Sequence, residues 1–191
     1  KEYATILLEE VDSALILKLN RPEKLNAFNM QMLDEMLDVI DYVNTNDNIK
    51  SLIITGSGKA FCAGADLSLG EKTFNKNFDT NAKYESDFMR DAGGILNLKI
   101  YNSLKPVIAA CNGDAVGIGA TMQLPADVRI ASKNSRFGFV FAKRGIVPDG
   151  CASWFLPKII GIPMALELCY SGKIINSAEA HRIGLVNYLV E

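Results

Sequence analysis

The sequence predicts a single α/β domain spanning residues 1–191. Short apolar segments with the alternation of strands recur along the chain, and segments with helical periodicity lie between them. Two of the apolar segments lead directly into glycine-bearing loops, as strand–turn–helix units do. With 191 residues, 49% of them hydrophobic and 22% charged, the chain can bury a core of its own.

The first half of the chain begins with a predicted hairpin. Thr5–Glu10 and Ala14–Leu19 alternate around a short polar turn, which is typical of two antiparallel strands. Asn29 is a suitable N-cap for an amphipathic helix that continues to about Val43. A further strand is expected at Ser51–Thr55.

The second half alternates helices and strands. Ser68–Asp87 has no clear period and predicts a mobile connection, and a helix is expected from Tyr84 to Ser103, weakened in the middle by Gly93-Gly94. Strands are predicted at Pro106–Ala110 and Asp127–Ala131, with a helix starting at Gly119 between them. Three later helices are predicted at Cys151–Ile159, Pro163–Tyr170 and Ser177–Ile183.

The two glycine-bearing loops are the most informative feature of the sequence. Gly56–Leu67 follows one predicted strand, and Cys111–Ala120 follows another. Glycine lets the backbone approach a ligand closely, and ligands of open α/β sheets bind at the carboxyl ends of strands. If both loops converge on one crevice, each can aim a backbone N–H at a single oxygen. Such a pair is an oxyanion hole made of main chain.

Composition excludes several classes of partner. There are 20 Lys and Arg residues against 22 Asp and Glu, a net charge of −2 without runs of like charge, so we expect no nucleic-acid partner. No apolar run is long enough to span a bilayer, and the first residues lack the pattern of a signal peptide, so we expect a cytoplasmic protein without a membrane partner.

Metal chemistry is also not expected. The four cysteines form no Cys-x-x-Cys pair and are expected to be small buried residues in a reducing compartment. His181 is the single histidine, which excludes a metal site that needs two, and we expect it to be structural.

Two other chemistries are disfavoured. The segment Gly117-Ile-Gly119 continues to Met122 where a dinucleotide fingerprint needs a third glycine, and Phe139 stands near the position of its acidic residue. A nucleophilic serine is disfavoured because the chain has no Gly-x-Ser-x-Gly segment.

Five blocks of sequence indicate a known family. They are Asn20–Phe28, Phe61–Leu67, Lys105–Gly113 with Gly117–Gly119, Arg144–Gly150 and Gly184–Val186. In order and spacing they resemble the crotonase (enoyl-CoA hydratase/isomerase) superfamily over nearly the whole chain. The resemblance implies repeated ββα turns that wind into a spiral. It also implies that this chain lacks the C-terminal helical region, and that the protein forms a homotrimer or hexamer.

The resemblance implies roles for named residues. The backbone N–H groups of Ala65 and Ile118 would stabilise the enolate of an acyl-CoA thioester. Coenzyme A enters as part of the substrate, and no separate cofactor is expected. Residues expected to bind the substrate are Lys24, Ala27, Ala63, Asp66, Leu67, Gly117, Thr121 and Phe141.

The acid/base residues depart from the hydratase pattern. The two glutamates of the family's hydratases fall at Thr121 and Phe141, neither of which can act as a general base near neutral pH. Asp149 stands where several isomerases of the family place their main carboxylate, and its apolar neighbours should raise its pKa by desolvation.

We therefore expect a double-bond isomerase with Asp149 as the acid/base. Three alternatives stay open: hydration by a non-standard set of acid/base groups, a non-catalytic acyl-CoA-binding protein, and an Asp149 that merely caps the following helix.

Overall fold

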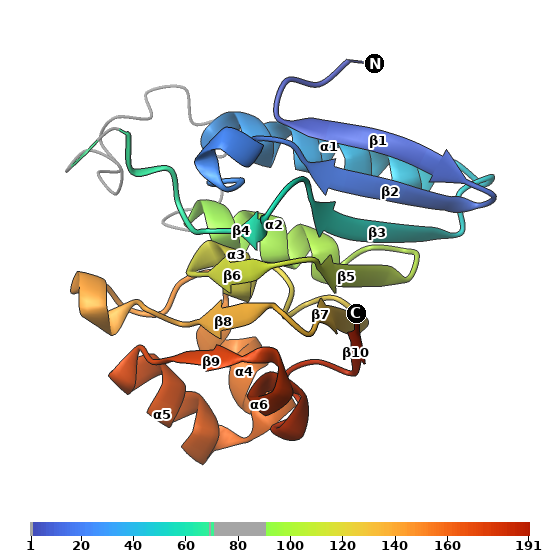
Figure 1. Ribbon diagram of the computed structural model, residues 1–191. Helices are drawn as coiled ribbons and strands as arrows, with labels where there is room; N and C mark the ends of the chain where they lie inside the picture. The colour runs from blue at the N-terminus through green and yellow to red at the C-terminus, as the bar shows by residue number, and fades with distance from the viewer. Residues whose placement is uncertain (1, 69, 71–90) are drawn as a thin grey trace.

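A computed structural model describes residues 2–68, 70 and 91–191 (Figure 1). Its larger sheet has six strands in the order β1-β2-β3-β5-β7-β10. Their bounds are Ile6–Val11, Ala14–Leu19, Ser51–Gly56, Val107–Cys111, Val128–Ser132 and Tyr188–Val190. β1 and β2 form the predicted antiparallel hairpin, and all later neighbours in this sheet pair in parallel.

A second, smaller sheet has the order β4-β6-β8-β9. The bounds of these strands are Ala60–Cys62, Asp114–Val116, Arg136–Gly138 and Ile174–Asn176. The first three pair in parallel, and β9 pairs antiparallel with β8. Each strand has three residues, too short for an alternating pattern to predict from the sequence.

The chain visits the two sheets in turn. β3 is followed by β4, β5 by β6, and β7 by β8, and each pair leads toward a helix before the next strand of the larger sheet (Figure 1). The repeated ββα turns expected from the family resemblance are thereby confirmed. Because β4 and β6 are parallel neighbours, the segments that follow these two strands lie next to one another.

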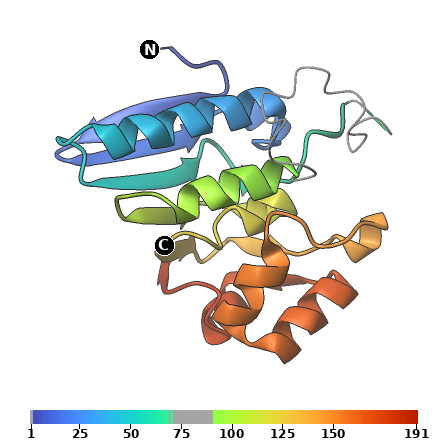
Figure 2. The same ribbon diagram turned by 180° about the vertical axis from the view of Figure 1, so that it is seen from behind.

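The helices lie mainly on one side of the larger sheet and at the end of the stack. Figure 2 shows α1 and α2 side by side across the back of the sheet, with α4 and α5 below them. The helix bounds are α1 Met30–Thr45, α2 Ala92–Tyr101, α3 Ile118–Thr121, α4 Ala152–Ile160, α5 Ile162–Ser171 and α6 Ser177–Arg182. Two 3₁₀ turns, η1 Pro22–Lys24 and η4 Ala142–Arg144, complete the elements that matter below.

Helix α1 forms as the sequence predicts. The Asn29 side chain accepts a hydrogen bond from the backbone N–H of Met32 at 2.9 Å, which satisfies one of the free amides of the first turn. Its apolar stripe is fully buried against the sheet and comprises Met32, Leu33, Met36, Val39, Ile40 and Val43.

Helix α2 differs from its prediction. It begins at Ala92 with Asp91 as its N-cap, and the predicted start at Tyr84 lies outside the described residues. Gly93-Gly94 therefore occupies the first turn and not the middle of the helix. Of the connection predicted over Ser68–Asp87, the structure describes Ser68 and Gly70, and the rest lies outside the described residues.

No disulfide joins the four cysteines, all of which lie in the described residues. Cys62 and Cys111 are buried as expected, whereas Cys151 and Cys169 are half-buried. Within residues 2–68, 70 and 91–191, no group of three or more His, Cys, Asp or Glu side chains is placed to hold a metal ion. Over the same residues, no helix has the length and apolarity that a bilayer crossing requires.

Candidate active site

The two glycine loops meet at the ends of β4 and β6. Because these strands pair in parallel, with Cys62 opposite Ala115, the chain leaves both strands in the same direction. A Cβ atom placed on Gly117 would stand 3.8 Å from the Cα of Gly64, and the two glycines have φ angles of +56° and +118°. The loops were expected to follow the strands of the larger sheet directly. Instead, a second strand stands between each of those strands and its loop.

The amide of Ala65 is available on the first loop. Phe28 donates its backbone N–H to Gly64 O at 2.8 Å, and Asp66 donates its own to Phe28 O at 2.7 Å. This bridge uses the groups on both sides of Ala65 and leaves the Ala65 N–H without an acceptor among the described residues. Ala65 is half-buried, and a backbone N–H without a protein acceptor is free to bind a ligand oxygen.

The amide of Ile118 is available on the second loop. Ile118 is the first residue of α3, and first-turn amides have no acceptor within their own helix. Gly117 O accepts hydrogen bonds from Ala120 and Thr121, and Gly117 N donates to Gly138 O, which fixes the turn on both sides. In the described part of the chain the Ile118 N–H donates to no protein acceptor.

Asp149 lies in the turn between η4 and α4, with its carboxyl group turned inward. Its Oδ1 atom is buried and has no hydrogen-bond partner within the described ranges. The N-cap of α4 is Cys151, and no side chain caps this helix, so Asp149 does not play the capping role that the sequence left open. Burial and, secondarily, the charge of Asp91 raise the pKa of Asp149 to about 7. The direction and the leading cause agree with the sequence prediction.

The Asp149 turn packs against the helix that begins with the Ile118 amide. A Cβ atom on Gly150 would stand 2.4 Å from the Oγ1 atom of Thr121. Gly93 of α2 fits between the same elements, since a Cβ there would meet Ile118 Cδ1 at 2.4 Å and Gly150 Cα at 3.3 Å. The carboxyl-bearing turn and the second loop are thus in contact.

Thr121 and Phe141, the positions of the two missing glutamates, are both buried, with 0% and 3% of their surface exposed. The Thr121 hydroxyl donates to Ile118 O at 3.3 Å, and Phe141 O accepts from the backbone amides of Arg144 and Ile146. A surface location for either would have contradicted the alignment of these segments with the family, and neither is at the surface.

The segment expected to hold coenzyme A is tied together by an ion pair. Arg21 donates to Asp66 Oδ2 at 2.6 Å and to the carbonyl oxygen of Ala27, and Lys24 Nζ lies 3.5 Å from the same Asp66 oxygen. The Arg21 hydrogen bond holds the pKa of Asp66 far below its usual range. Asp66 therefore braces η1 against the Ala65 loop.

Three of the predicted binding residues lie at the surface beside this ion pair. Lys24, Ala63 and Leu67 are exposed, and Ala63 donates its backbone N–H to Leu25 O at 3.0 Å. Together they form a solvent-facing border next to the Ala65 amide.

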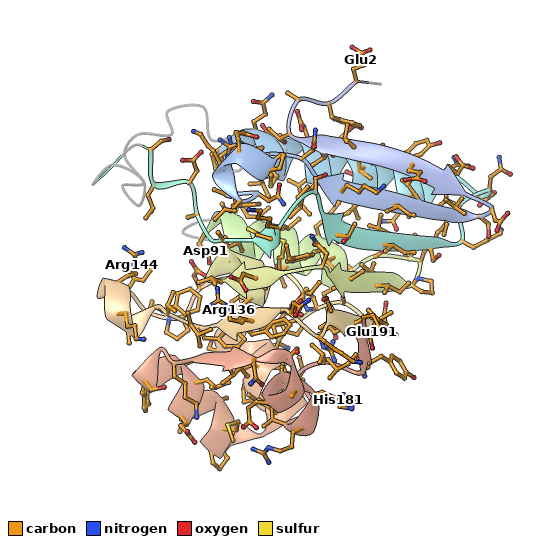
Figure 3. The ribbon with its side chains drawn as sticks, in the orientation of Figure 1. Glu2, Asp91, Arg136, Arg144, His181 and Glu191 are labelled. Atoms are coloured by element: carbon orange, nitrogen blue, oxygen red, sulfur yellow. The ribbon has the colours of Figure 1, made fainter. Side chains whose placement is uncertain are left out.

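Sequence reasoning missed three residues that hold these segments in place. Buried Asn26, at φ +56°, donates to the carbonyl oxygens of Ser57 and Ala60. Asp91 (labelled in Figure 3) and buried Asn97 reach from α2 to the Asp149 turn. Asp91 had a detectable signal, because an aspartate before a helical run is a typical N-cap. Asn97 had none, since its role depends on contacts with distant segments.

Comparison with known proteins agrees with this geometry. The family model described as enoyl-CoA hydratase/isomerase matches residues 9–191. An enoyl-CoA hydratase of Alternaria alternata is 40% identical over 86% of this chain, which spans 53% of that relative. The 1,2-epoxyphenylacetyl-CoA isomerase of Escherichia coli is 34% identical over 97% of this chain and 70% of its own length.

A solved structure shows the same fold. The enoyl-CoA hydratase/isomerase (crotonase) structure from Legionella pneumophila superposes with a TM-score of 0.87 at 31% identity, covering 99% of this chain and 71% of that one. The chain thus spans between about half and 70% of the length of these relatives. With its two sheets and its ββα turns, this chain belongs to the enoyl-CoA hydratase/isomerase (crotonase) superfamily.

Proposed function

We propose that the protein acts on acyl-CoA thioesters and moves a double bond by proton transfer through an enolate. The observation that carries the proposal is the buried carboxyl group of Asp149, which caps no helix and lies in a turn packed against the loop of Ile118. The free amides of Ala65 and Ile118 supply the accompanying oxyanion donors.

The proposed reaction needs one base. Asp149 as carboxylate takes the proton from the α carbon of a 3-enoyl-CoA, and the electron pair of that C–H bond becomes a dienolate. The negative charge collects on the thioester oxygen, where each backbone donor is worth on the order of 3 kcal/mol. Asp149 then returns the proton to the γ carbon, giving a 2-enoyl-CoA with no net change in atoms or charge.

The pKa of Asp149 suits this exchange. A value of about 7 keeps part of the population ionised at neutral pH and makes the protonated form a useful acid. By contrast, water addition in the family's hydratase pattern uses two glutamates, and Thr121 and Phe141 stand at those positions.

Hydration is the second candidate, because the relative from Alternaria alternata is named a hydratase and the one from Escherichia coli an isomerase. The two reactions share the oxyanion hole and differ in what the base activates. The acyl group and the oligomeric state, for which a trimer or hexamer is our prediction, belong to the same proposal.

The test is a panel of straight-chain and aromatic 2-enoyl-CoA and 3-enoyl-CoA thioesters, with products separated by chromatography. We expect 3-enoyl substrates to be converted to 2-enoyl products faster than water is added to 2-enoyl substrates. Asp149→Asn should lower turnover by about 10²–10⁴-fold while thioester binding changes little.

A matched measurement in D₂O separates catalysis from binding. An active base incorporates deuterium at the α or γ carbon of the bound thioester, and Asp149→Asn should suppress it. Full turnover in Asp149→Asn would eliminate this carboxylate as the base. Thioester binding without any proton exchange would assign the protein to the non-catalytic alternative.

A further inference from the structure

One helix forms hydrogen bonds with both backbone groups of Gly150, the residue after Asp149. The backbone N–H of Gly150 donates to Asp91 Oδ1 at 3.2 Å, and the carbonyl oxygen of Gly150 accepts from Asn97 Nδ2 at 2.5 Å. Asp91 is the N-cap of α2 and Asn97 lies within the helix, so both contacts come from a single rigid element. Gly150 itself has a φ of +56°, a conformation that needs fixing from outside.

The same two side chains also bind the neighbouring elements. Asp91 Oδ1 accepts a second hydrogen bond from Gly94 N at 2.7 Å, which secures the first turn of α2. Asn97 Nδ2 donates a second hydrogen bond to Thr121 O at 2.9 Å, on the helix that begins at Ile118. Three hydrogen bonds therefore fix the Asp149 turn and the helix that begins at Ile118 relative to α2.

Placing the polar side chain of Asn97 in the core has an energetic cost. It is fully buried, and its Oδ1 atom accepts no hydrogen bond within the part of the chain that the structure describes. An unpaired buried amide oxygen costs free energy that a leucine of similar size would not. The gain that offsets this cost is the pair of carbonyl groups that Asn97 holds.

Asp91 adds an electrostatic effect. The influences on the pKa of Asp149 are burial, the charge of Asp91 and the Asp149 backbone N–H, in that order. Across the contact from α3 the neighbours Ile118 and Thr121 are uncharged, and Lys143 and Arg144 of η4 are exposed. Neither carboxylate has a salt-bridge partner among the described residues.

We propose that Asp91 and Asn97 are positioning residues for Asp149, holding the Gly150 peptide so that the carboxyl group stays aimed inward beside the second glycine loop. The inference rests on the proposed role of Asp149 as the base. It adds two residues, on an element that contributes no atom to the reaction itself, to the machinery of that base.

Asp91→Asn separates the charge of Asp91 from its hydrogen bonds. Asparagine keeps an Oδ1 acceptor for Gly94 and Gly150 but removes the charge, so the turn stays in place while the pKa of Asp149 falls. The acid limb of the pH–turnover profile should move to lower pH by roughly 0.5–1 pH unit, with the high-pH plateau within about threefold of the parent. A purely structural N-cap would leave the profile in place. Asp41→Asn removes the same charge from an exposed site and serves as the control.

Asn97→Leu tests the hydrogen bond to the carbonyl oxygen of Gly150. Leucine keeps the bulk but releases Gly150 O and Thr121 O, so turnover should fall about 10- to 100-fold while KM for the thioester changes less than threefold. Asn102→Leu, at the exposed end of the same helix, should leave both values unchanged. If circular dichroism shows that Asn97→Leu does not fold, Asp91→Ala decides the positioning role. Alanine removes the acceptor of the Gly150 N–H, so its turnover should fall well below that of Asp91→Asn, which keeps the acceptor.

Comparison with Asp149→Asn separates the two levels of the argument. If Asp149→Asn is inactive while folded Asn97→Leu and Asp91→Ala both keep the parental turnover, the positioning role is overturned and the proposed function stands. If Asp149→Asn keeps full turnover, the proposed function fails and the positioning role fails with it. Lowered turnover in Asn97→Leu or Asp91→Ala together with an inactive Asp149→Asn supports both.

Discussion

The carbonyl oxygen of Cys62 lies 2.0 Å from the point where a Cβ atom on Gly119 would stand. Because no Cβ atom approaches a carbonyl oxygen so closely, the end of β4 and the helix α3 meet at a separation that glycine alone permits. The loops of Ala65 and Ile118 owe their proximity to this contact and to the equally tight approach of Gly113 to the Lys59 carbonyl oxygen.

Gly119→Ala should separate the two loops. The new methyl group forces β4 and α3 apart, which should cost about 1–3 kcal/mol of unfolding free energy and lower turnover at least tenfold. Chemical denaturation and steady-state kinetics measure both effects. Gly145→Ala is the matched control: its φ is +68° with nothing within 4 Å, so it should lose about 1 kcal/mol from backbone strain and keep its turnover. Parental activity in Gly119→Ala would show that loop spacing is not critical.

Turnover of the parent protein should rise with pH through neutrality. Asp149 acts as a base only when ionised, and burial and the Asp91 charge place its pKa at about 7. The pH–turnover profile should therefore show an acid limb with a midpoint near neutral pH, read from initial rates in buffers of constant ionic strength. A midpoint near the ordinary carboxyl value would mean that Asp149 is hydrated in the working protein.

Asp149→Asn should stabilise the fold at alkaline pH. The folded-state pKa of Asp149 is raised from the ordinary value of 3.8 to about 7, so its ionisation costs folding free energy as pH rises from about 4 to about 7. Asparagine avoids that cost, and near pH 8 the variant should be more stable by on the order of 4 kcal/mol, since one pKa unit corresponds to about 1.4 kcal/mol. Below pH 4 the two proteins should unfold at similar denaturant concentrations. An equal stability at both pH values would contradict the buried location of the carboxyl group.

Asp66→Asn should weaken the brace between η1 and the Ala65 loop. The Asp66 side chain is 11% exposed and pairs with an Arg21 side chain that is 12% exposed, so loss of the charge should cost about 1–3 kcal/mol and raise KM for the thioester. The low pKa of Asp66 makes this contribution present above the usual carboxyl pKa and lost in strong acid.

Asp114→Asn is the control for that brace. Asp114 binds Arg136, whose side chain is 60% exposed, so removing this charge should change stability by less than about 0.5 kcal/mol. If both substitutions cost the same, the Arg21–Asp66 pair has no special structural role.

The sequence predicts most helices and every strand of the larger sheet except the three-residue strand β10, because the signals of those elements are local. Asn29 before the stripe of α1, and the starts of α5 and α6 at Ile162 and Ser177, are fixed by residues adjacent in the chain. The smaller sheet could not be predicted by periodicity, since strands such as Ala60–Cys62 have only three residues and exist because parallel neighbours hold them. Those strands were expected only through the family resemblance.

The residues of the candidate site also differ in whether a local sequence signal reveals them. The glycine loops are visible in the sequence, but Ala65, Ile118 and Asp149 were assigned as site residues through the family resemblance. Asn97 was missed because its partners, Thr121 and Gly150, are 24 and 53 positions away. Contacts of that kind arise from the spiral winding, which no short stretch of residues specifies.

The alternation of the chain between two sheets has a consequence for association. The larger sheet ends at β10 and the smaller at β9, both three-residue strands, while the other edge of the smaller sheet is the buried strand β4. Among the described residues the one long outer strand is β1, which exposes Glu9 and Glu10 together with Leu7, Leu8 and Val11. Short edges are poor templates for an added strand, so a neighbouring polypeptide that extends a sheet has β1 as its main opportunity, and there the two glutamates oppose the pairing.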